Sequence, residues 1–246
     1  MNDALAICHS TYTRVLRVRS LYFLLASVLI IVAAAHQYVD LTCGRQQELM
    51  YDTGAALLSL VGVITALIVC FDIPRDLHAK DVVVLFSKPL GRTQYLVGKF
   101  LGVVWLATIH LAIVTFGIML ILKAEKGAWP LNFIPLAVTT WGSTVMLVAM
   151  GVFLGTFLAE VPGALLTAVT YVVGSSTEIL YQSQVGVARL CFSLLPNFGL
   201  LDFKMEIGNE LAISWKLIIA AVAYALVYSV ALLSLASILF HRRDLA

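Results

Sequence analysis

The 246-residue sequence has little charge and lacks the motifs by which many binding proteins are recognised. Only 12% of its residues are charged and the net charge is +2, so there is no clustered basic face of the kind that nucleic-acid binding requires. The four cysteines, at positions 8, 43, 70 and 191, form no CxxC pair and no zinc-like group with histidine. We therefore expect no resident metal and no nucleic-acid partner.

Catalytic motifs are missing as well. Neither HExxH nor GxSxG occurs, so metalloprotease and hydrolase functions have no starting point. The stretch from Gly91 to Lys99 superficially resembles a phosphate-binding loop, but six residues separate its glycines where four are required. Phe100 follows the lysine where a Ser or Thr is needed to reach magnesium. We expect this chain to be no enzyme, with no catalytic residue, no bound cofactor and no ATP hydrolysis of its own.

Apolar residues, by contrast, are abundant. They make up 61% of the chain, and the mean hydropathy is +0.97. Soluble domains usually contain about 45–50% apolar residues, and a soluble protein of this composition would expose patches large enough to aggregate. Lipid is the solvent in which the composition is reasonable. The sequence therefore predicts an all-α, polytopic integral membrane protein whose single transmembrane domain occupies residues 1–246.

Six segments are candidates to cross the membrane. A helix needs about 20 apolar residues to cross a hydrocarbon core of about 30 Å. The predicted spans are residues 20–39, 53–71, 95–122, 134–159, 161–181 and 214–240, the fifth being the weakest because residues 174–178 interrupt it. Residues 3–18 are typical of a basic amphipathic helix in the membrane interface, with a short solvated leader as the alternative. Gly98–Gly102 and Gly151–Gly155 have GxxxG spacing, which permits close helix contacts.

The distribution of Lys and Arg predicts the orientation. Ten of the 16 basic residues fall on one side of the membrane if both termini are cytoplasmic, and six are spread over three outer loops. An even number of spans follows from this arrangement. We expect a multi-pass protein of a cell membrane, with the bacterial inner membrane as its location.

Only a few polar residues, on the outer side or within the predicted spans, are candidates to line a transport path. His110 is the only ionisable residue predicted deep inside a span, and hydrogen bonding to a neighbouring helix is the simplest role for it. Glu178 could line a polar vestibule or mark the end of the fifth span. Residues 182–213 are too apolar for a solvated loop and too broken for a span, so re-entrant short helices around Pro196 and Phe198 could form a gate or a cap. Cys43 and Cys191 fall on the same predicted side, which permits a disulfide but does not establish one.

The charged segment between the second and third spans, FDIPRDLHAKDVVVLFSKPLGRTQYLVGK from Phe71 to Lys99, is the most informative part of the chain. Pro74 suits the first turn of a short helix, and Asp76 and Lys80 have the favourable i, i+4 order. Pro89 and Gly91 then favour a break before the chain re-enters the membrane. We expect a short cytoplasmic helix and a turn, and an ordinary solvated loop is the alternative.

Two runs in this segment resemble the signature of ABC-2-type permeases. They are Leu85–Arg92 (LFSKPLGR) and Tyr95–Gly102 (YLVGKFLG), which are similar to the family stretch LLSKP-x-SR-x-x-YLLGKFLG. The ending from Phe240 to Leu245 and the run Leu194–Asn197 resemble weaker family patterns. Six spans with an amphipathic N-terminal helix match the family architecture over the whole chain. Asp76 stands where the family usually has glutamate, and His78 and Lys80 also depart from its common residues.

The resemblance implies a transporter without its own ATPase. In such proteins the loop after the second span forms a coupling helix that docks on a separate ATPase subunit, which binds the ATP and Mg²⁺. The implied partners are two ABC ATPase subunits, a second copy of this chain or a related permease, and membrane lipid. The residues predicted for the ATPase-coupling interface are Asp76, Leu77, Lys80, Asp81, Leu85, Lys88 and Arg92. Those predicted for a substrate path or gate are Glu178, Pro196 and Phe198.

Two functions therefore remain. The first is the permease subunit of an ATP-driven exporter, which moves a substrate or transmits force across the membrane. The second is a non-transporting anchor or scaffold subunit, which needs membrane spans but no path. The sequence does not identify a substrate, although its weakly charged interior disfavours a highly charged solute in a wide aqueous pore.

Overall fold

The computed structural model describes residues 2–16, 26–28, 30, 34, 46–78, 91–126, 129–176, 195–204 and 214–241. Every regular element in these residues is helical, which confirms the all-α prediction. The α-helices are α1 (Asn2–Leu16), α3 (Gln46–His78), α5 (Arg92–Lys126), α6 (Phe133–Gly155), α7 (Glu160–Ser175) and α11 (Trp215–His241), and η2 (Gly199–Leu201) is a short 3₁₀ helix.

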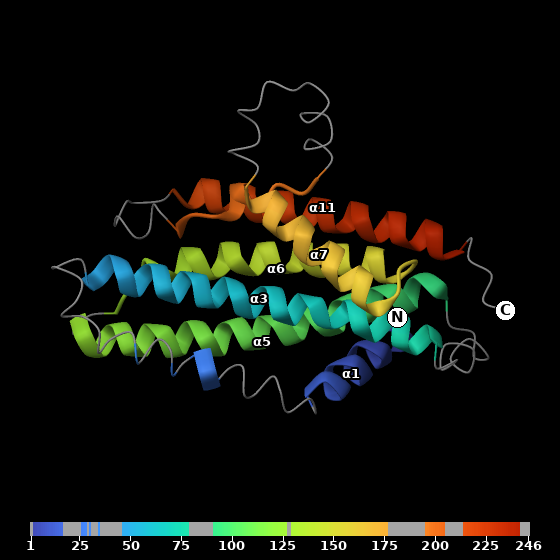
Figure 1. The fold of residues 1–246 in the computed structure, drawn as a ribbon, viewed down its shortest axis with the longest axis horizontal. Helices are drawn as coiled ribbons and strands as arrows, with labels where there is room; N and C mark the ends of the chain where they lie inside the picture. The colour runs from blue at the N-terminus through green and yellow to red at the C-terminus, as the bar shows by residue number, and fades with distance from the viewer. Residues whose placement is uncertain are drawn as a thin grey trace, which may run out of the picture.

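The long helices pack side by side in a bundle. Figure 1 shows α3, α6 and α11 running in one direction and α5 in the opposite direction, with α7 crossing the bundle obliquely. Helix α1, the end of α3, the start of α5 and the end of α11 meet at one end, which we call the basic end. Segment 195–204 and the start of α11 lie at the opposite end. Both ends of the described chain thus lie at the same end of the bundle.

Four described helices are long and apolar enough to cross a membrane. The qualifying segments are Tyr51–Leu77, Arg92–Ala124, Phe133–Gly155 and Trp215–His241. Helix α7 has only 16 residues within the described range, so it falls short of the length test. The predicted first span, residues 20–39, is outside the described residues except for helical positions at 26–28, 30 and 34. The fold is therefore compatible with a membrane-spanning protein, and six spans remain a prediction.

The largest boundary error concerns α3. The sequence analysis ended the second span at Phe71 and placed Pro74 in the first turn of a new helix. Instead α3 continues without interruption to His78 and holds Pro74 in its interior. An interior proline removes one backbone hydrogen bond. At this point α3 lies beside Gly155 of α6, where an added Cβ would make ordinary contacts with Ile73 and Pro74 at 3.5 and 3.7 Å.

Helix α1 is amphipathic, as predicted for residues 3–18. Ile7, Thr11 and Val15 are spaced four residues apart and are buried, whereas Leu5 on the other face is 58% exposed. The buried face packs on α5 at Gly102, where an added Cβ would lie 2.9 Å from the Thr11 Cβ and 3.0 Å from the Cys8 carbonyl oxygen. The helix is therefore docked against the bundle, and its place in the membrane interface stays a prediction.

Small residues bring the central helices together. An alanine Cβ at Gly151 of α6 would lie 2.6 Å from Val69 Cγ1 and 2.9 Å from Cys70 Sγ of α3. An alanine Cβ at Gly62 of α3 would likewise overlap the Thr144 hydroxyl oxygen of α6. Because association in lipid depends on close packing and not on the hydrophobic effect, these contacts position α3 against α6. One glycine of each GxxxG pair, Gly102 and Gly151, therefore lies at a close helix contact, whereas Gly155 makes only ordinary contacts.

We predict that Gly151→Ala destabilises the protein by about 1–3 kcal/mol, because the new methyl group overlaps α3 in a closely packed interface. Thermal unfolding of the purified protein in detergent measures the effect. Gly163→Ala on α7 is the matched control, since its Cβ would meet only the Leu158 Cβ, at 3.7 Å. This control should be neutral or slightly stabilising. Equal melting temperatures for the two variants would contradict the assignment of Gly151 to a tight contact.

Candidate functional site

An ion cluster joins three helices at the basic end. It consists of Arg14 from α1, Asp72 and Asp76 from α3, and Tyr95 and Lys99 from α5. Asp72, Asp76 and Lys99 are buried, at 8%, 3% and 3% exposure. The i, i+4 spacing of the two aspartates places both carboxylates on one face of α3, and Lys99 faces them from α5.

The contacts within the ion cluster are direct. The Lys99 ammonium pairs with an Asp76 oxygen at 2.7 Å and also contacts Asp72. Arg14 Nη1 lies 2.6 Å from Asp76 and 3.5 Å from Asp72. The Tyr95 hydroxyl donates to Asp76 Oδ2, the oxygen that Lys99 also contacts, at 3.1 Å. The two carboxylates and two cations balance in charge, which is the condition for burying such groups at the edge of an apolar bundle.

Arg14 is the most exposed member of the cluster. Its side chain is 53% exposed, so solvent weakens its Coulombic attraction to the aspartates. The hydrogen bond to Asp76 nevertheless raises the pKa of the guanidinium above its ordinary value. Arg14 therefore stays charged at any physiological pH and connects α1 to the buried carboxylates of α3.

Arg92 connects the start of α5 to the end of α11. Its guanidinium donates to the carbonyl oxygens of Phe240 and His241 at 3.1 and 3.0 Å. These carbonyls lie in the last turn of α11, where helical partners are lacking and a cation is favourable. The stacked rings of Tyr95 and Phe240 reinforce the same junction.

These positions change the roles expected for two predicted interface residues. Asp76 is buried and paired within the chain, and Arg92 caps α11, so neither is presented as a free charge for a partner. Leu77 is half-buried against the main core. The other predicted interface residues lie outside the described residues: Lys80, Asp81, Leu85 and Lys88. Segment 79–90 thus begins and ends at helices that the ion cluster and Arg92 hold in place.

Sequence reasoning missed the cluster because it ended the second span at Phe71 and so placed Asp72 and Asp76 in a cytoplasmic segment. The missed signal was the pair Asp72 and Asp76, which shares a helix face only if α3 continues beyond Phe71. The predicted contact for His110 is present: its Nδ1 atom lies 3.4 Å from the Thr65 hydroxyl oxygen on α3.

At the opposite end, segment 195–204 packs against α7 and α11. The Phe198 amide donates to the Gly174 carbonyl oxygen at 3.0 Å, and the Phe198 ring meets Tyr171 edge to face. The Asn197 amide donates to the Tyr224 hydroxyl at 3.0 Å. Pro196 and Phe198 are both buried. Glu178, Cys43 and Cys191 lie outside the described residues, so the vestibule and disulfide hypotheses stay predictions.

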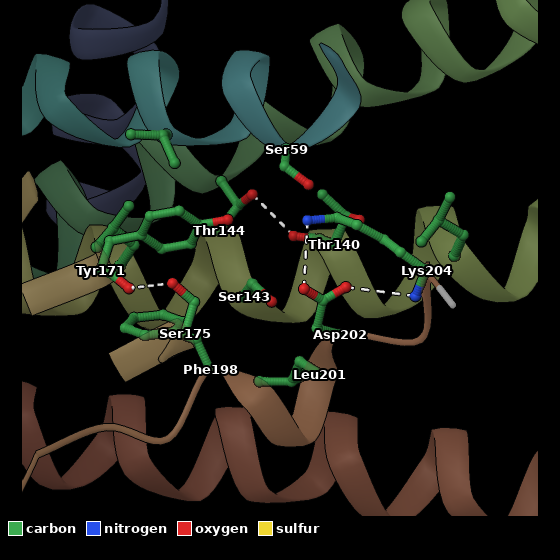
Figure 2. Close-up of a pocket in the computed structure, with 13 residues that line it drawn as sticks. Ser59, Thr140, Ser143, Thr144, Tyr171, Ser175, Phe198, Leu201, Asp202 and Lys204 are labelled. Atoms are coloured by element: carbon green, nitrogen blue, oxygen red, sulfur yellow. Dashed lines mark hydrogen bonds and ion pairs between the residues drawn. The ribbon is translucent and has the colours of Figure 1, made fainter. Parts of the chain in front are cut away.

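A small cavity lies beside Phe198, between α3, α6, α7 and segment 195–204 (Figure 2). Its volume is about 20 Å³, enough for about one water molecule. Apolar and polar side chains both line it, and the polar ones are Ser59, Thr140, Ser143, Thr144, Tyr171, Ser175, Asp202 and Lys204. We call this the hydroxyl-lined cavity. Of the predicted gate residues, Phe198 lines it directly.

No protein-family model matches the chain, and no curated protein matches it either. The described residues also contain no group of three or more His, Cys, Asp or Glu side chains that could hold a metal ion. Interpretation of the site therefore depends on its geometry.

We predict that Lys99→Met destabilises the protein by about 3–5 kcal/mol, because it leaves two buried carboxylates with only Arg14 as a counter-charge. Thermal unfolding in detergent provides the measurement. Lys123→Met is the control, since Lys123 makes a surface cation–π contact with Trp129 at 4.0 Å and its loss should cost about 0.5–1 kcal/mol.

A double variant separates charge balance from lost packing. Adding Asp72→Asn to Lys99→Met restores one carboxylate to one cation, so it should recover part of the lost stability. If the loss of stability in the double variant instead equals the sum of the losses in the two single variants, Asp72 and Lys99 are not coupled. The cluster would then not act as a unit.

Proposed function

We propose that this chain is the permease subunit of an ATP-driven exporter, with segment 79–90 as the coupling element that docks on a separate ATPase. The proposal includes two ATPase subunits, which bind ATP and Mg²⁺, and a second permease copy or a related permease. It places the protein in a cell membrane with six spans and with the basic end in the cytoplasm. The resemblance of residues 85–102 to ABC-2-type permeases motivates the assignment.

The observation that carries the proposal is how segment 79–90 is anchored. It leaves α3 two residues after Asp76 and enters α5 at Arg92. Asp76 is ion-paired to α1 and α5, and Arg92 is hydrogen-bonded to the end of α11. A displacement of this segment would therefore act on four helices at once. Buried ion pairs are suited to this transmission because separating them is costly.

The distribution of charge supports a partner surface at the same end. Charged residues are concentrated in the segment at Lys80, Asp81 and Lys88, and charged groups at an interface give partner specificity. Leu85 supplies an apolar anchor of the kind that dominates binding energy. The membrane helices themselves contain no ATP-binding motif, so an energy source in a partner is consistent with the sequence.

The charge reversals Asp81→Lys and Lys88→Glu should each reduce ATPase copurification about tenfold or more, since 1.4 kcal/mol of lost binding corresponds to a factor of ten. Quantitative mass spectrometry of the protein purified from its native membrane measures the bound partner. Lys123→Glu at the opposite end is the control and should retain the partner. Membrane insertion and melting temperature should match the unmodified protein in all three variants.

If the chain is a non-transporting scaffold subunit, the same experiment should give a different result. If no protein with nucleotide-binding motifs copurifies and an unrelated soluble assembly does, the chain is an anchor subunit. If an ATPase copurifies but neither Asp81→Lys nor Lys88→Glu lowers the amount bound, segment 79–90 is not the docking site.

A further inference from the structure

One face of α3 stays exposed between α1 and α7 at the basic end (Figure 1). On one side of this face, Ile68 packs against the small apolar cluster that α1 and α5 form. On the other side, the Cys70 Sγ atom lies 3.3 Å from the Thr167 hydroxyl oxygen of α7. Successive residues of a helix are about 100° apart, so Phe71 and Arg75 lie between these two contacts. Both are exposed, Phe71 at 42%.

Arg75 differs from the other described cations of the basic end. Arg14 and Lys99 are paired with the buried aspartates, and Arg92 is hydrogen-bonded to the end of α11. Within the part of the chain that the structure describes, Arg75 has no ion-pair or hydrogen-bond partner. Its guanidinium therefore offers its full set of N–H donors to a ligand outside the bundle.

The position of Arg75 along α3 corresponds to the headgroup layer of a bilayer. The apolar segment Tyr51–Leu77 has 27 residues, so it is about 40 Å long at about 1.5 Å per residue. When this segment is centred on a hydrocarbon core of about 30 Å, roughly 5 Å at each end extend into the headgroups. Arg75 lies about 3 Å from the end of the segment, whereas Phe71 lies about 9 Å from it, inside the hydrocarbon.

The rest of this face is apolar. Leu60, Ile64, Leu67 and Phe71 follow one another at intervals of three or four residues, and each is exposed or half-buried. Their strip is about 17 Å long, close to the length of one hydrocarbon leaflet, about 15 Å. The face thus combines an unpaired guanidinium at headgroup depth with an apolar strip as long as an acyl chain. We call it the Arg75 face.

The charge at the basic end favours an anionic ligand. In the predicted orientation this end contains ten of the 16 basic residues and six of the 14 acidic ones. Two of those acidic residues, Asp72 and Asp76, are buried and paired within the chain. Each basic residue near a membrane surface strengthens the attraction to anionic lipid. A lipid with a net negative charge is therefore favoured over a zwitterionic one.

We propose that the Arg75 face is a binding site for an anionic phospholipid, with the phosphate on Arg75 and an acyl chain along the strip from Phe71 to Leu60. A guanidinium binds phosphate through two parallel N–H donors, which a lysine cannot reproduce. A zwitterionic lipid carries the same phosphate, but its own cation competes with Arg75 for it. This inference goes beyond the permease function and does not depend on it.

The experiment is native mass spectrometry of the full chain in detergent, titrated with phosphatidylglycerol or with phosphatidylcholine. The unmodified protein should bind phosphatidylglycerol more tightly. Arg75→Gln should weaken that binding about fivefold, which is the contribution of one basic residue at an anionic surface. Arg75→Lys keeps the charge and should lie between the two. Because Arg75 has no partner among the described residues, none of these variants should change the melting temperature in lipid-free detergent.

Lys216→Gln is the matched control. Lys216 is an exposed cation near the start of α11, at the opposite end of the bundle, so its loss should leave phosphatidylglycerol binding unchanged. Inorganic phosphate in large molar excess tests the headgroup chemistry alone. It should not displace phosphatidylglycerol, because it has no acyl chain to occupy the strip.

Four results would overturn the proposal. The first is equal affinity of the unmodified protein for the two lipids. The second is unchanged phosphatidylglycerol binding in Arg75→Gln. A third is an equal loss of binding in Lys216→Gln, which would indicate a general effect of charge and not a site. The last is displacement of the lipid by inorganic phosphate, which would make the ligand a soluble anion.

Discussion

The two buried carboxylates of α3 are the constraint on which the basic end depends. Asp72 and Asp76 lie where α3 leaves the apolar part of the bundle, and unpaired they would be strongly unfavourable there. Lys99 from α5 and Arg14 from α1 supply the charges that make their burial tolerable. Removal of any one member would leave another uncompensated, so α1, α3 and α5 are linked at this end.

The opposite end is organised differently. There the contacts are single hydrogen bonds and ring packing, as between Phe198 and Tyr171, and the hydroxyl-lined cavity lies behind a weak ion pair. Tightly packed glycines, among them Gly62 and Gly151, hold the middle of the bundle between these two ends. The structure thus combines a basic end joined by buried ion pairs with an opposite end whose Lys204–Asp202 ion pair is partly exposed.

Hydropathy alone was enough to predict the long helices, because the need to satisfy every backbone group in lipid permits few alternatives. It could not find where α3 ends, since Pro74 is a strong local signal for a helix start and α3 nevertheless continues through it to His78. Asp72 was therefore assigned to a loop. The cavity was not predictable either, because Thr144 and Lys204 meet only through the tertiary arrangement. GxxxG spacing was only partly informative, since one glycine of each pair, Gly102 or Gly151, lies at a close contact.

The account is tested most directly by hydrogen exchange of the α1 backbone amides in the full chain, compared with Arg14→Gln. An undocked helix of 15 residues is marginal in isolation, so its amides would exchange quickly. If the ion cluster holds α1 on the bundle, Arg14→Gln should accelerate exchange throughout α1 while α6 remains protected. Unchanged protection of α1 in Arg14→Gln would show that apolar contacts alone hold the helix, and would contradict the central role of the cluster.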